Sequence, residues 1–142
     1  MKILYDHQTF TLQKFGGISR YFYELVNELD KVSNIEPEIS LLLSNNHFIS
    51  DYKFTNHFNL FSNSNLKGKF RVFNYLNKMN TISKLKKQNF DIFHPTYYDP
   101  YFLKYLEKKP FVLTVYDMIH EKFQDTVNDA KEISLKKKLL IE

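Results

Sequence analysis

Residues 2–29 read KILYDHQTFTLQKFGGISRYFYELVNEL, and this stretch decides the fold. Its first four residues are rich in apolar side chains and predict a short β-strand, followed by polar residues 6–15 and the pair Gly16-Gly17. Beyond the glycines, apolar side chains recur at i, i+3, i+4, i+7, i+8 and i+11, namely Ile18, Tyr21, Phe22, Leu25, Val26 and Leu29. Such spacing is typical of a helix that packs one face on a core. The stretch therefore predicts a strand, a loop and an amphipathic helix.

The rest of the chain continues this alternation. Further strands are predicted at 37–43, 90–94 and 110–115. The last of them is apolar almost throughout, which indicates burial on both faces. Further helices are predicted at 70–87, at 100–106 behind an Asp99 cap, and after Asn128. Strands that alternate with helices predict an α/β fold, here a Rossmann-like parallel sheet with helices on both faces.

Two of these segments carry more detailed predictions. On the helix at 70–87, the apolar face is predicted to contain Val72, Phe73, Leu76 and Met79. Residues 47–69 are polar, rich in asparagine and interrupted by phenylalanines. This composition predicts an irregular excursion that aromatic side chains hold against the domain.

Length and composition limit the class of protein. The chain has 142 residues and a mass of 17.1 kDa, which predicts a single domain over 1–142. It contains no cysteine, so disulfides, thiol catalysis and cysteine-bound metals are excluded. The net charge of +4 permits an anionic partner without requiring one. The apolar amino terminus is interrupted at Asp6, and no stretch approaches the ~20 apolar residues of a transmembrane span. We therefore expect a cytoplasmic protein, with the inner face of the membrane as an alternative location.

The first candidate site lies where the first predicted helix begins. Gly16 and Gly17 would let a ligand approach backbone N–H groups at the positive end of the helix dipole, a geometry that accepts phosphate. Arg20, one turn further on, could pair with the same phosphate. The alternatives are that the glycines only make a tight turn and that Arg20 is only solvated. Because G-x-G-x-x-G and G-x-x-x-x-G-K-[ST] are both absent, dinucleotide and P-loop sites are not predicted.

Two more candidate groups follow the third and fourth predicted strands. His94 ends the third predicted strand, and Thr96, Tyr97 and Tyr98 follow it with hydroxyls that would suit a sugar. After the fourth strand, a phenol, a carboxylate and an imidazole come together in Tyr116, Asp117 and His120. The alternatives are that His94 is a core residue, Asp117 a turn former and His120 a surface residue.

Metal and nucleic-acid sites are not predicted. His7, His94 and His120 lie at three strand ends, but they lack the paired spacing of metal ligands. The lysine runs at 84–87, 108–109 and 136–138 are interpreted as solvated helix faces.

Four motifs taken together resemble a known family. KILYD (2–6), FGGISRY (15–21), DIFH (91–94) and LTVYDMIH (113–120) are similar, in this order, to the amino-terminal half of retaining GT-B glycosyltransferases of the family 4 type. The resemblance implies two Rossmann-like domains that face a cleft, with the acceptor on the amino-terminal domain and the nucleotide sugar on the other. It also implies transfer with retention, no required metal and no cofactor besides the nucleotide-sugar substrate.

The resemblance also implies roles for individual residues. Gly16, Gly17 and Arg20 would approach the donor diphosphate across the cleft. His94, Thr96 and Tyr97 would line the acceptor side, and Tyr116, Asp117 and His120 would lie near the transferred sugar as catalytic side chains. Many relatives carry histidine where this chain has Tyr116, so the role of that imidazole does not transfer, and His120 is a possible substitute.

The expected function is therefore the acceptor-side half of a hexose transferase in polysaccharide biosynthesis. The substrates would be a nucleotide sugar and a glycan or lipid-linked acceptor, the latter with peripheral membrane contact. Glu142 precedes the family's donor-binding half, so we expect the 142 residues alone to be inactive. The alternatives are a stand-alone Rossmann-like module that binds a nucleotide or a partner without catalysis, and a truncated, inactive gene product.

Overall fold

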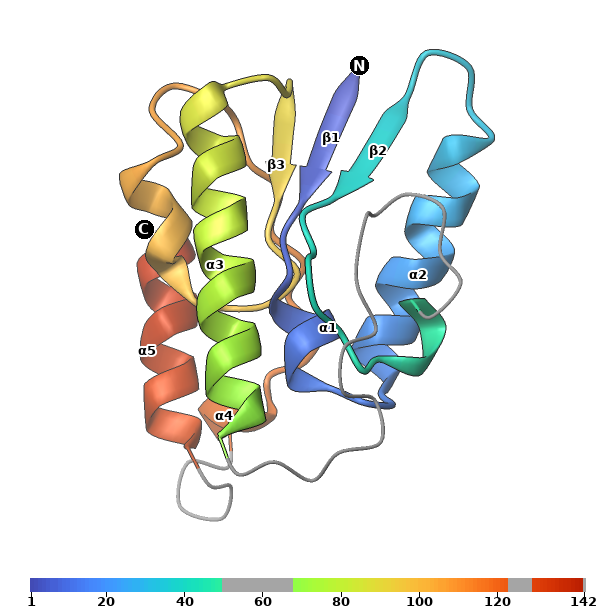
Figure 1. Ribbon diagram of the computed structural model, residues 1–142. Helices are drawn as coiled ribbons and strands as arrows, with labels where there is room; N and C mark the ends of the chain where they lie inside the picture. The colour runs from blue at the N-terminus through green and yellow to red at the C-terminus, as the bar shows by residue number, and fades with distance from the viewer. Residues whose placement is uncertain (50–67, 123–128, 142) are drawn as a thin grey trace.

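The sheet has three strands, all parallel. A computed structural model describes residues 1–49, 68–122 and 129–141, with the side chain of His120 outside the description. Strands β1 (Lys2–Tyr5), β2 (Glu36–Ile39) and β3 (Ile92–His94) lie in the order β2-β1-β3 (Figure 1). Tyr5 stands opposite Ile39 on one side and His94 on the other. The chain thus passes from β1 to β2 on one side and returns to β3 on the other, which puts a topological switch point between β1 and β3.

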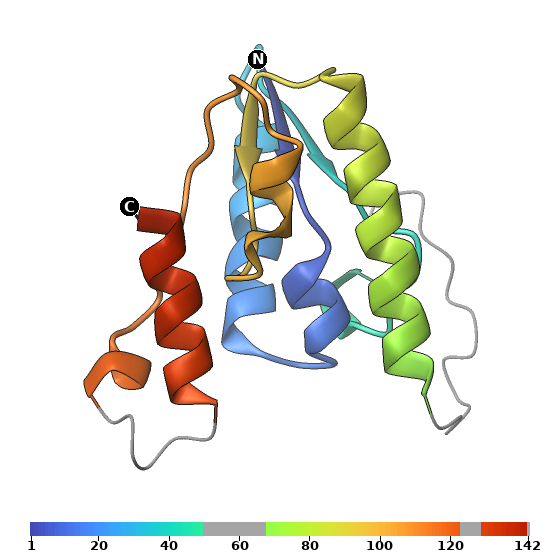
Figure 2. The same ribbon diagram turned by 90° about the vertical axis from the view of Figure 1, so that its left-hand side faces the viewer.

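Helices cover both faces of this sheet. They are α1 (Gln8–Leu12), α2 (Gly17–Asp30), α3 (Lys69–Lys87), α4 (Ile119–Lys122) and α5 (Ala130–Ile141), with 3₁₀ turns η1 (His47–Ile49) and η2 (Pro100–Lys104). Ile3 and Tyr5 of β1 pack in one core cluster with Phe22 and Val26 of α2. Leu4, on the opposite face, packs with Ile82 and Leu85 of α3 and with η2. Figure 2 shows the sheet nearly edge-on with α3 along one side. The predicted α/β class with a parallel sheet, Rossmann-like in broad terms, is confirmed.

The predicted fourth strand is reduced to a single bridge. Phe111 pairs in parallel with Phe93, and the Val112 N–H donates to the Phe93 carbonyl at 2.9 Å. Val112 and Val115 are 48% and 41% exposed, so the predicted burial on both faces is wrong. The physical reason is position, because this segment lies at the outer edge of the sheet and no described strand pairs with its other side.

The helix predicted at 70–87 exists, but with a different face inward. Of its four predicted core residues only Phe73 is buried, while Val72, Leu76 and Met79 are exposed. Asn77 and Thr81 are fully buried instead. The Asn77 Oδ1 accepts hydrogen bonds from the N–H groups of Leu42 and Leu43, both at 2.9 Å. These bonds replace strand pairing beyond Ile39, and β2 is therefore shorter than the predicted 37–43.

Two other predictions differ or stay open. The loop predicted at 6–15 contains the short helix α1. Most of the predicted excursion, residues 50–67, and the cap Asn128 lie outside the described residues. Within the described part of the chain, none of the helices has the length and apolar character needed to cross a bilayer.

Candidate functional site

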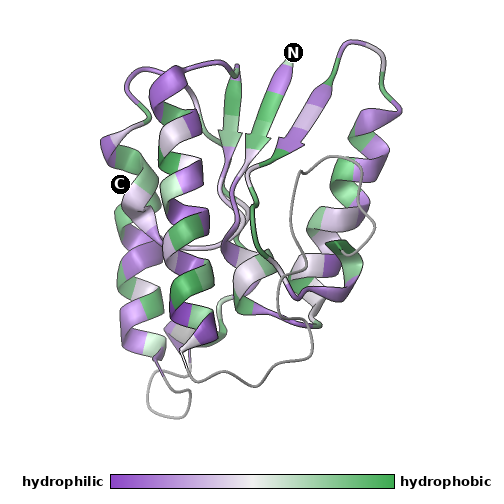
Figure 3. Cartoon of the chain, in the orientation of Figure 1, coloured by the Kyte–Doolittle hydropathy of each residue, from purple (hydrophilic) through white to green (hydrophobic). Residues whose placement is uncertain are grey.

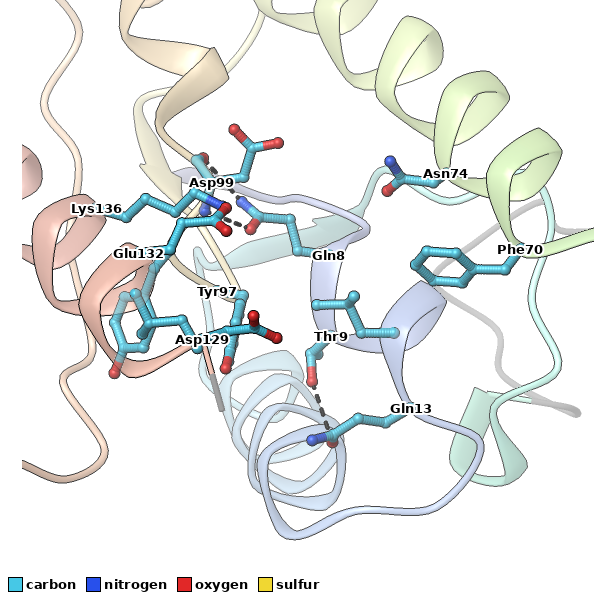
Figure 4. A pocket seen from close by; sticks show the side chains of 13 residues that line it. Gln8, Thr9, Gln13, Phe70, Asn74, Tyr97, Asp99, Asp129, Glu132 and Lys136 are labelled. Atoms are coloured by element: carbon cyan, nitrogen blue, oxygen red, sulfur yellow. Dashed lines mark hydrogen bonds and ion pairs between the residues drawn. The ribbon is translucent and has the colours of Figure 1, made fainter. Parts of the chain in front are cut away.

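A pocket of about 450 Å³ opens at the carboxyl edge of the sheet. Gln8 and Thr9 reach it from the segment after β1, and Tyr97, Tyr98 and Asp99 reach it from the segment after β3. It therefore lies at the switch point, where ligands of open parallel sheets bind. Figure 4 shows Phe70 and Asn74 of α3 on one side of the pocket and the α5 residues Glu132 and Lys136 on the opposite side. The remaining described lining residues are Leu12, Gln13, Asp129 and Ile133.

The floor of the pocket is fixed by buried hydrogen bonds around Asp6. This carboxylate is fully buried and accepts hydrogen bonds from Gln8 Nε2 at 2.7 Å, Thr96 Oγ1 at 2.7 Å and Tyr101 Oη at 3.2 Å. The Gln8 side chain also accepts from the Asp99 N–H at 2.8 Å and donates to the Asp99 carbonyl at 3.2 Å. Gln8 thus joins the two segments that flank the switch point, and its orientation is set before any ligand arrives.

The α5 wall of the pocket is charged. Glu132 and Lys136 form an ion pair one helical turn apart, and Asp129 precedes the helix. The described lining holds the carboxylates of Asp99, Asp129 and Glu132 against the single ammonium of Lys136. Lys78, outside the lining, also pairs with Asp99 at 3.1 Å, so three carboxylates face two ammonium groups. The remaining negative excess favours neutral or cationic hydroxyl-bearing ligands over anions.

A buried lysine anchors α5 to two other segments of the chain, one that follows β3 and one that follows the bridge between Phe93 and Phe111. Lys137 is 3% exposed and donates to the Asp117 carbonyl at 2.7 Å and to Glu121 Oε2 at 3.2 Å. Its ammonium also lies 4.9 Å from the centre of the Tyr98 ring, within cation–π range. These contacts hold the α5 wall in place.

The predicted phosphate site adjoins the pocket through Gln13. Gln13 lines the pocket, and its Oε1 accepts from the Ser19 N–H in the first turn of α2 at 3.4 Å. Gly16 caps α2 with no side-chain hydrogen bond, and a Cβ atom added to it would lie 2.1 Å from that Oε1. Gly17 is exposed, and a Cβ there would meet nothing within 4 Å, so the core does not require a glycine at this position. Arg20 is exposed and lies 3.9 Å from Glu24.

The residues predicted after β3 separate into one lining residue and two buried ones. Tyr97 lines the pocket. Thr96 lies beneath the pocket. Its hydroxyl donates to Asp6 Oδ1 at 2.7 Å and accepts a hydrogen bond from the Thr9 N–H at 3.1 Å. His94 is buried against the Tyr5 and Phe22 rings, with Nε2 2.9 Å from Thr114 Oγ1. Burial lowers the pKa of His94 to about 4, although the Asp6 carboxylate acts in the opposite direction, so the imidazole is neutral at neutral pH.

Of the predicted catalytic group, Tyr116 and Asp117 are not among the described residues that line the pocket. Tyr116 is half-buried, donates through its hydroxyl to the Thr96 carbonyl at 3.0 Å and has a pKa raised mainly by burial. Asp117 is exposed, and its Oδ1 accepts the Ile119 N–H at 3.0 Å at the start of α4. His120 belongs to α4, and its side chain lies outside the described residues. The catalytic roles of these three residues stay predictions.

Several lining residues were not predicted from the sequence. Gln8 and Thr9 come directly after the first strand, so the rule that ligands bind at strand ends could have identified them. Asn74, Asp129 and Glu132 lie on α3 and at the start of α5, with no motif that marks them. Across the described residues, no three histidine or acidic side chains are grouped as metal ligands.

Comparison of the chain with protein-family models, with curated proteins and with solved structures finds no match.

Proposed function

We propose that this chain is the acceptor-side domain of a retaining glycosyltransferase. The observation that carries the proposal is the pocket at the β1/β3 switch point, next to the amino terminus of α2. The pocket would hold an acceptor saccharide, while the first turn of α2 faces the diphosphate of a nucleotide sugar bound to a second domain. No cofactor is needed, because the nucleotide sugar is itself the activated substrate.

The chemistry of the lining supports a saccharide ligand. Amides of Gln13 and Asn74 can donate to and accept from sugar hydroxyls, and the phenol of Tyr97 adds both a hydroxyl and a ring face. Gln8 can only accept through Oε1, because its Nε2 protons are used by Asp6 and the Asp99 carbonyl. Carboxylates such as Asp129 accept from hydroxyl groups strongly. A volume of about 450 Å³ is in the range of small-molecule sites.

The proposed reaction breaks the bond between the anomeric carbon and the diphosphate oxygen and forms a bond from that carbon to an acceptor hydroxyl oxygen, whose proton leaves with the departing nucleoside diphosphate. The acceptor is a glycan or a lipid-linked precursor in polysaccharide synthesis, at the cytoplasmic side of the cell. The domain would contribute orientation of the acceptor, and the N–H groups of Gly17 and Ile18 at the start of α2 would add stabilisation of the leaving diphosphate.

Titration of the ¹⁵N-labelled chain with neutral sugars, amino sugars and uronic acids tests the pocket. We expect saturable amide shifts at Gln8, Tyr97 and Asp99, weakest for uronic acids because of the acidic lining. Asn74→Ala should remove these shifts, whereas Asn27→Ala on α2, outside the described lining, should leave them unchanged. Shifts that persist in Asn74→Ala, or no shift with any sugar, would contradict the assignment of the pocket.

A second function is favoured by the exposed start of α2. Its N-cap Gly16 has no side chain, so the N–H groups of Gly17 and Ile18 could meet a nucleotide phosphate without a second domain, although Gln13 Oε1 already accepts the Ser19 N–H. A non-catalytic nucleotide-binding module predicts saturable nucleotide binding at roughly micromolar concentration by this chain alone, within the usual range of affinities. The glycosyltransferase proposal predicts weak or no nucleotide binding until a donor domain is added.

A further inference from the structure

The first turn of α2 is capped from outside the helix, by the side chain of Gln13. An N-cap side chain normally accepts the N–H of the second or third helical residue, but the N-cap here is Gly16, which has no side chain. Gln13 Oε1 takes this part, because it accepts the Ser19 N–H at 3.4 Å. The oxygen of an uncharged amide therefore lies where an anion bound to the start of a helix would place one of its oxygens.

Gly16 makes room for this amide. Its φ of −179° is an extended conformation that any residue adopts, so the backbone does not require glycine here. A Cβ atom on Gly16 would instead lie 2.1 Å from Gln13 Oε1 and 2.5 Å from Gln13 Cδ. The glycine therefore leaves a space beside the start of α2, and the Gln13 carboxamide fills it.

The side chain of Gln13 is held more loosely than its backbone. The backbone N–H donates to the Thr9 carbonyl at 3.0 Å, and the backbone carbonyl accepts from Asn46 Nδ2 at 2.7 Å. The amide oxygen accepts from the Ser19 N–H and, at 3.5 Å, from Thr9 Oγ1 (Figure 4). Both of these distances exceed the roughly 3.2 Å within which such bonds are strong. Gln13 also lines the pocket, so its amide has a space into which it can turn.

The start of α2 is fixed, in contrast to this amide. Figure 3 shows hydrophobic bands along α2 between hydrophilic ones, and its Phe22 and Val26 are fully buried in the core. In the first turn, the Gly16 carbonyl accepts from the Arg20 N–H at 3.1 Å and from Ser19 Oγ at 3.0 Å. A ligand that reaches the N–H groups of this turn must therefore displace the Gln13 amide rather than move the helix.

We propose that Gln13 is an internal competitor for the diphosphate at the start of α2. In the closed arrangement its amide oxygen occupies the Ser19 N–H. In the open arrangement the side chain turns into the pocket, and the Ser19 N–H joins those of Gly17 and Ile18 in binding a diphosphate. This inference rests on the proposed function, in which α2 faces the diphosphate of a nucleotide sugar. It makes Gln13 a residue that sets the affinity for the diphosphate.

Titration of the ¹⁵N-labelled 142-residue chain with inorganic pyrophosphate, at constant ionic strength, tests this competition. The affinity is measured from the backbone amide shifts of Gly17, Ile18 and Ser19. We expect Gln13→Ala to bind pyrophosphate roughly fivefold more tightly than the unaltered chain, because the closed arrangement no longer reduces the binding-competent population. In the unaltered chain, the side-chain amide signals of Gln13 should shift together with the Ser19 amide.

Two further variants separate competition from a general disturbance of the site. Gln13→Glu keeps an acceptor oxygen and adds a negative charge that the start of a helix favours, so it should lose pyrophosphate binding. Leu12→Ala shortens the neighbouring lining side chain, which has no hydrogen-bonding group, and should bind pyrophosphate as the unaltered chain does. A disturbance of the site would weaken binding in all three variants, whereas competition strengthens it in Gln13→Ala.

Two results would overturn the proposal, and they differ in what they say of the proposed function. Equal or weaker binding by Gln13→Ala, with shifts still present at residues 17–19, would show that the amide does not compete and would leave the diphosphate contact of α2 standing. No shift at these residues in any variant would remove that contact itself, and the role of Gln13 with it.

Discussion

Asp6 is the residue on which the floor of the pocket depends. Its replacement in Asp6→Ala removes the acceptor of buried donors on Gln8, Thr96 and Tyr101. Since unsatisfied buried donors are costly, we expect the free energy of unfolding to fall by about 3 kcal/mol or more. Urea denaturation followed by circular dichroism measures this change.

Asp91→Ala is the matched control for Asp6→Ala. Asp91 is exposed and accepts one backbone hydrogen bond, from the Lys2 N–H at 2.6 Å. Its loss should cost no more than about 1 kcal/mol, the usual net value of one hydrogen bond. Equal stability losses in the two variants would show that the buried network around Asp6 does not stabilise the domain.

The buried imidazole of His94 should make the free energy of unfolding depend on pH. Its pKa is about 4 in the folded chain against an ordinary value of 6.5, so the unfolded chain binds the extra proton first as the pH falls. The contribution of His94 to stability is therefore present above about pH 6.5 and is lost as the pH falls toward 4, while the buried His7, whose pKa burial also lowers, acts in the same direction. The full loss in the free energy of unfolding from His94 is about 3 kcal/mol, of which about 2 kcal/mol is already lost at about pH 5. Urea midpoints at the two ends of this range measure it, and His94→Gln should be less sensitive to acid.

Thr114→Val provides the comparison for His94→Gln. It removes the hydroxyl that His94 Nε2 contacts at 2.9 Å but keeps the buried imidazole. Its stability should be lower at neutral pH, with most of the acid-dependent loss retained. If His94→Gln loses as much stability on acidification as the unaltered chain, the imidazole is not the group responsible.

At the scale of elements, the sequence predicted those helices and strands whose position depends on the spacing of apolar residues. β1 and α2 lie where the 2–29 pattern places them, and α2 buries Phe22 and Val26 of the predicted stripe. Tyr21, predicted on the same stripe, is 44% exposed. The inward face of α3 could not be predicted, since it is selected by hydrogen bonds from Asn77 to a segment 34 and 35 residues away in the chain. The reduced fourth strand is a similar case, because an apolar run does not reveal whether a strand will pair on its second side.

The role of Asn77 in orienting α3 can be tested directly. Asn77→Leu would suit the apolar pattern of a buried helix face, but it leaves the N–H groups of Leu42 and Leu43 without an acceptor. We expect a loss of about 3 to 5 kcal/mol in the free energy of unfolding, measured by urea denaturation. Asn80→Leu, which removes only a half-buried bond to Ser40 Oγ at 3.0 Å, should cost about 1 kcal/mol. A harmless Asn77→Leu would mean that apolar packing alone orients this helix.

At the scale of the whole molecule, the pocket is assembled from segments far apart in the chain. Its lining extends from Gln8 to Lys136 and comes from α1, α3, α5 and the segment after β3. The carboxyl edge of the sheet was predictable from the order of strands and helices, and Tyr97 was correctly placed at it. The contribution of α5 to the pocket could not be predicted, because it depends on Lys137. The sequence suggests that this lysine is solvated, whereas the structure buries it against Asp117 and Glu121.

The composition of this pocket predicts that residues 1–142 alone transfer no sugar. A leaving diphosphate needs positive groups held close to it. The described lining has three carboxylates, and the nearby cations, Lys136 and the Lys78 beside Asp99, are both paired with carboxylates. The loss of even one such stabilising donor typically lowers a rate by roughly 10²–10³, so under the proposed function these residues, assayed without a donor-binding domain, should show no measurable turnover. The measurement is product formation from a panel of nucleotide sugars and acceptors, by this chain and by a version extended with a donor-binding domain. Gly17→Val in the extended version should fold normally, because a Cβ there meets nothing within 4 Å, and should transfer poorly, because its side chain obstructs the start of α2. Turnover by the short chain at the rate of the extended one would instead require a diphosphate site within residues 1–142.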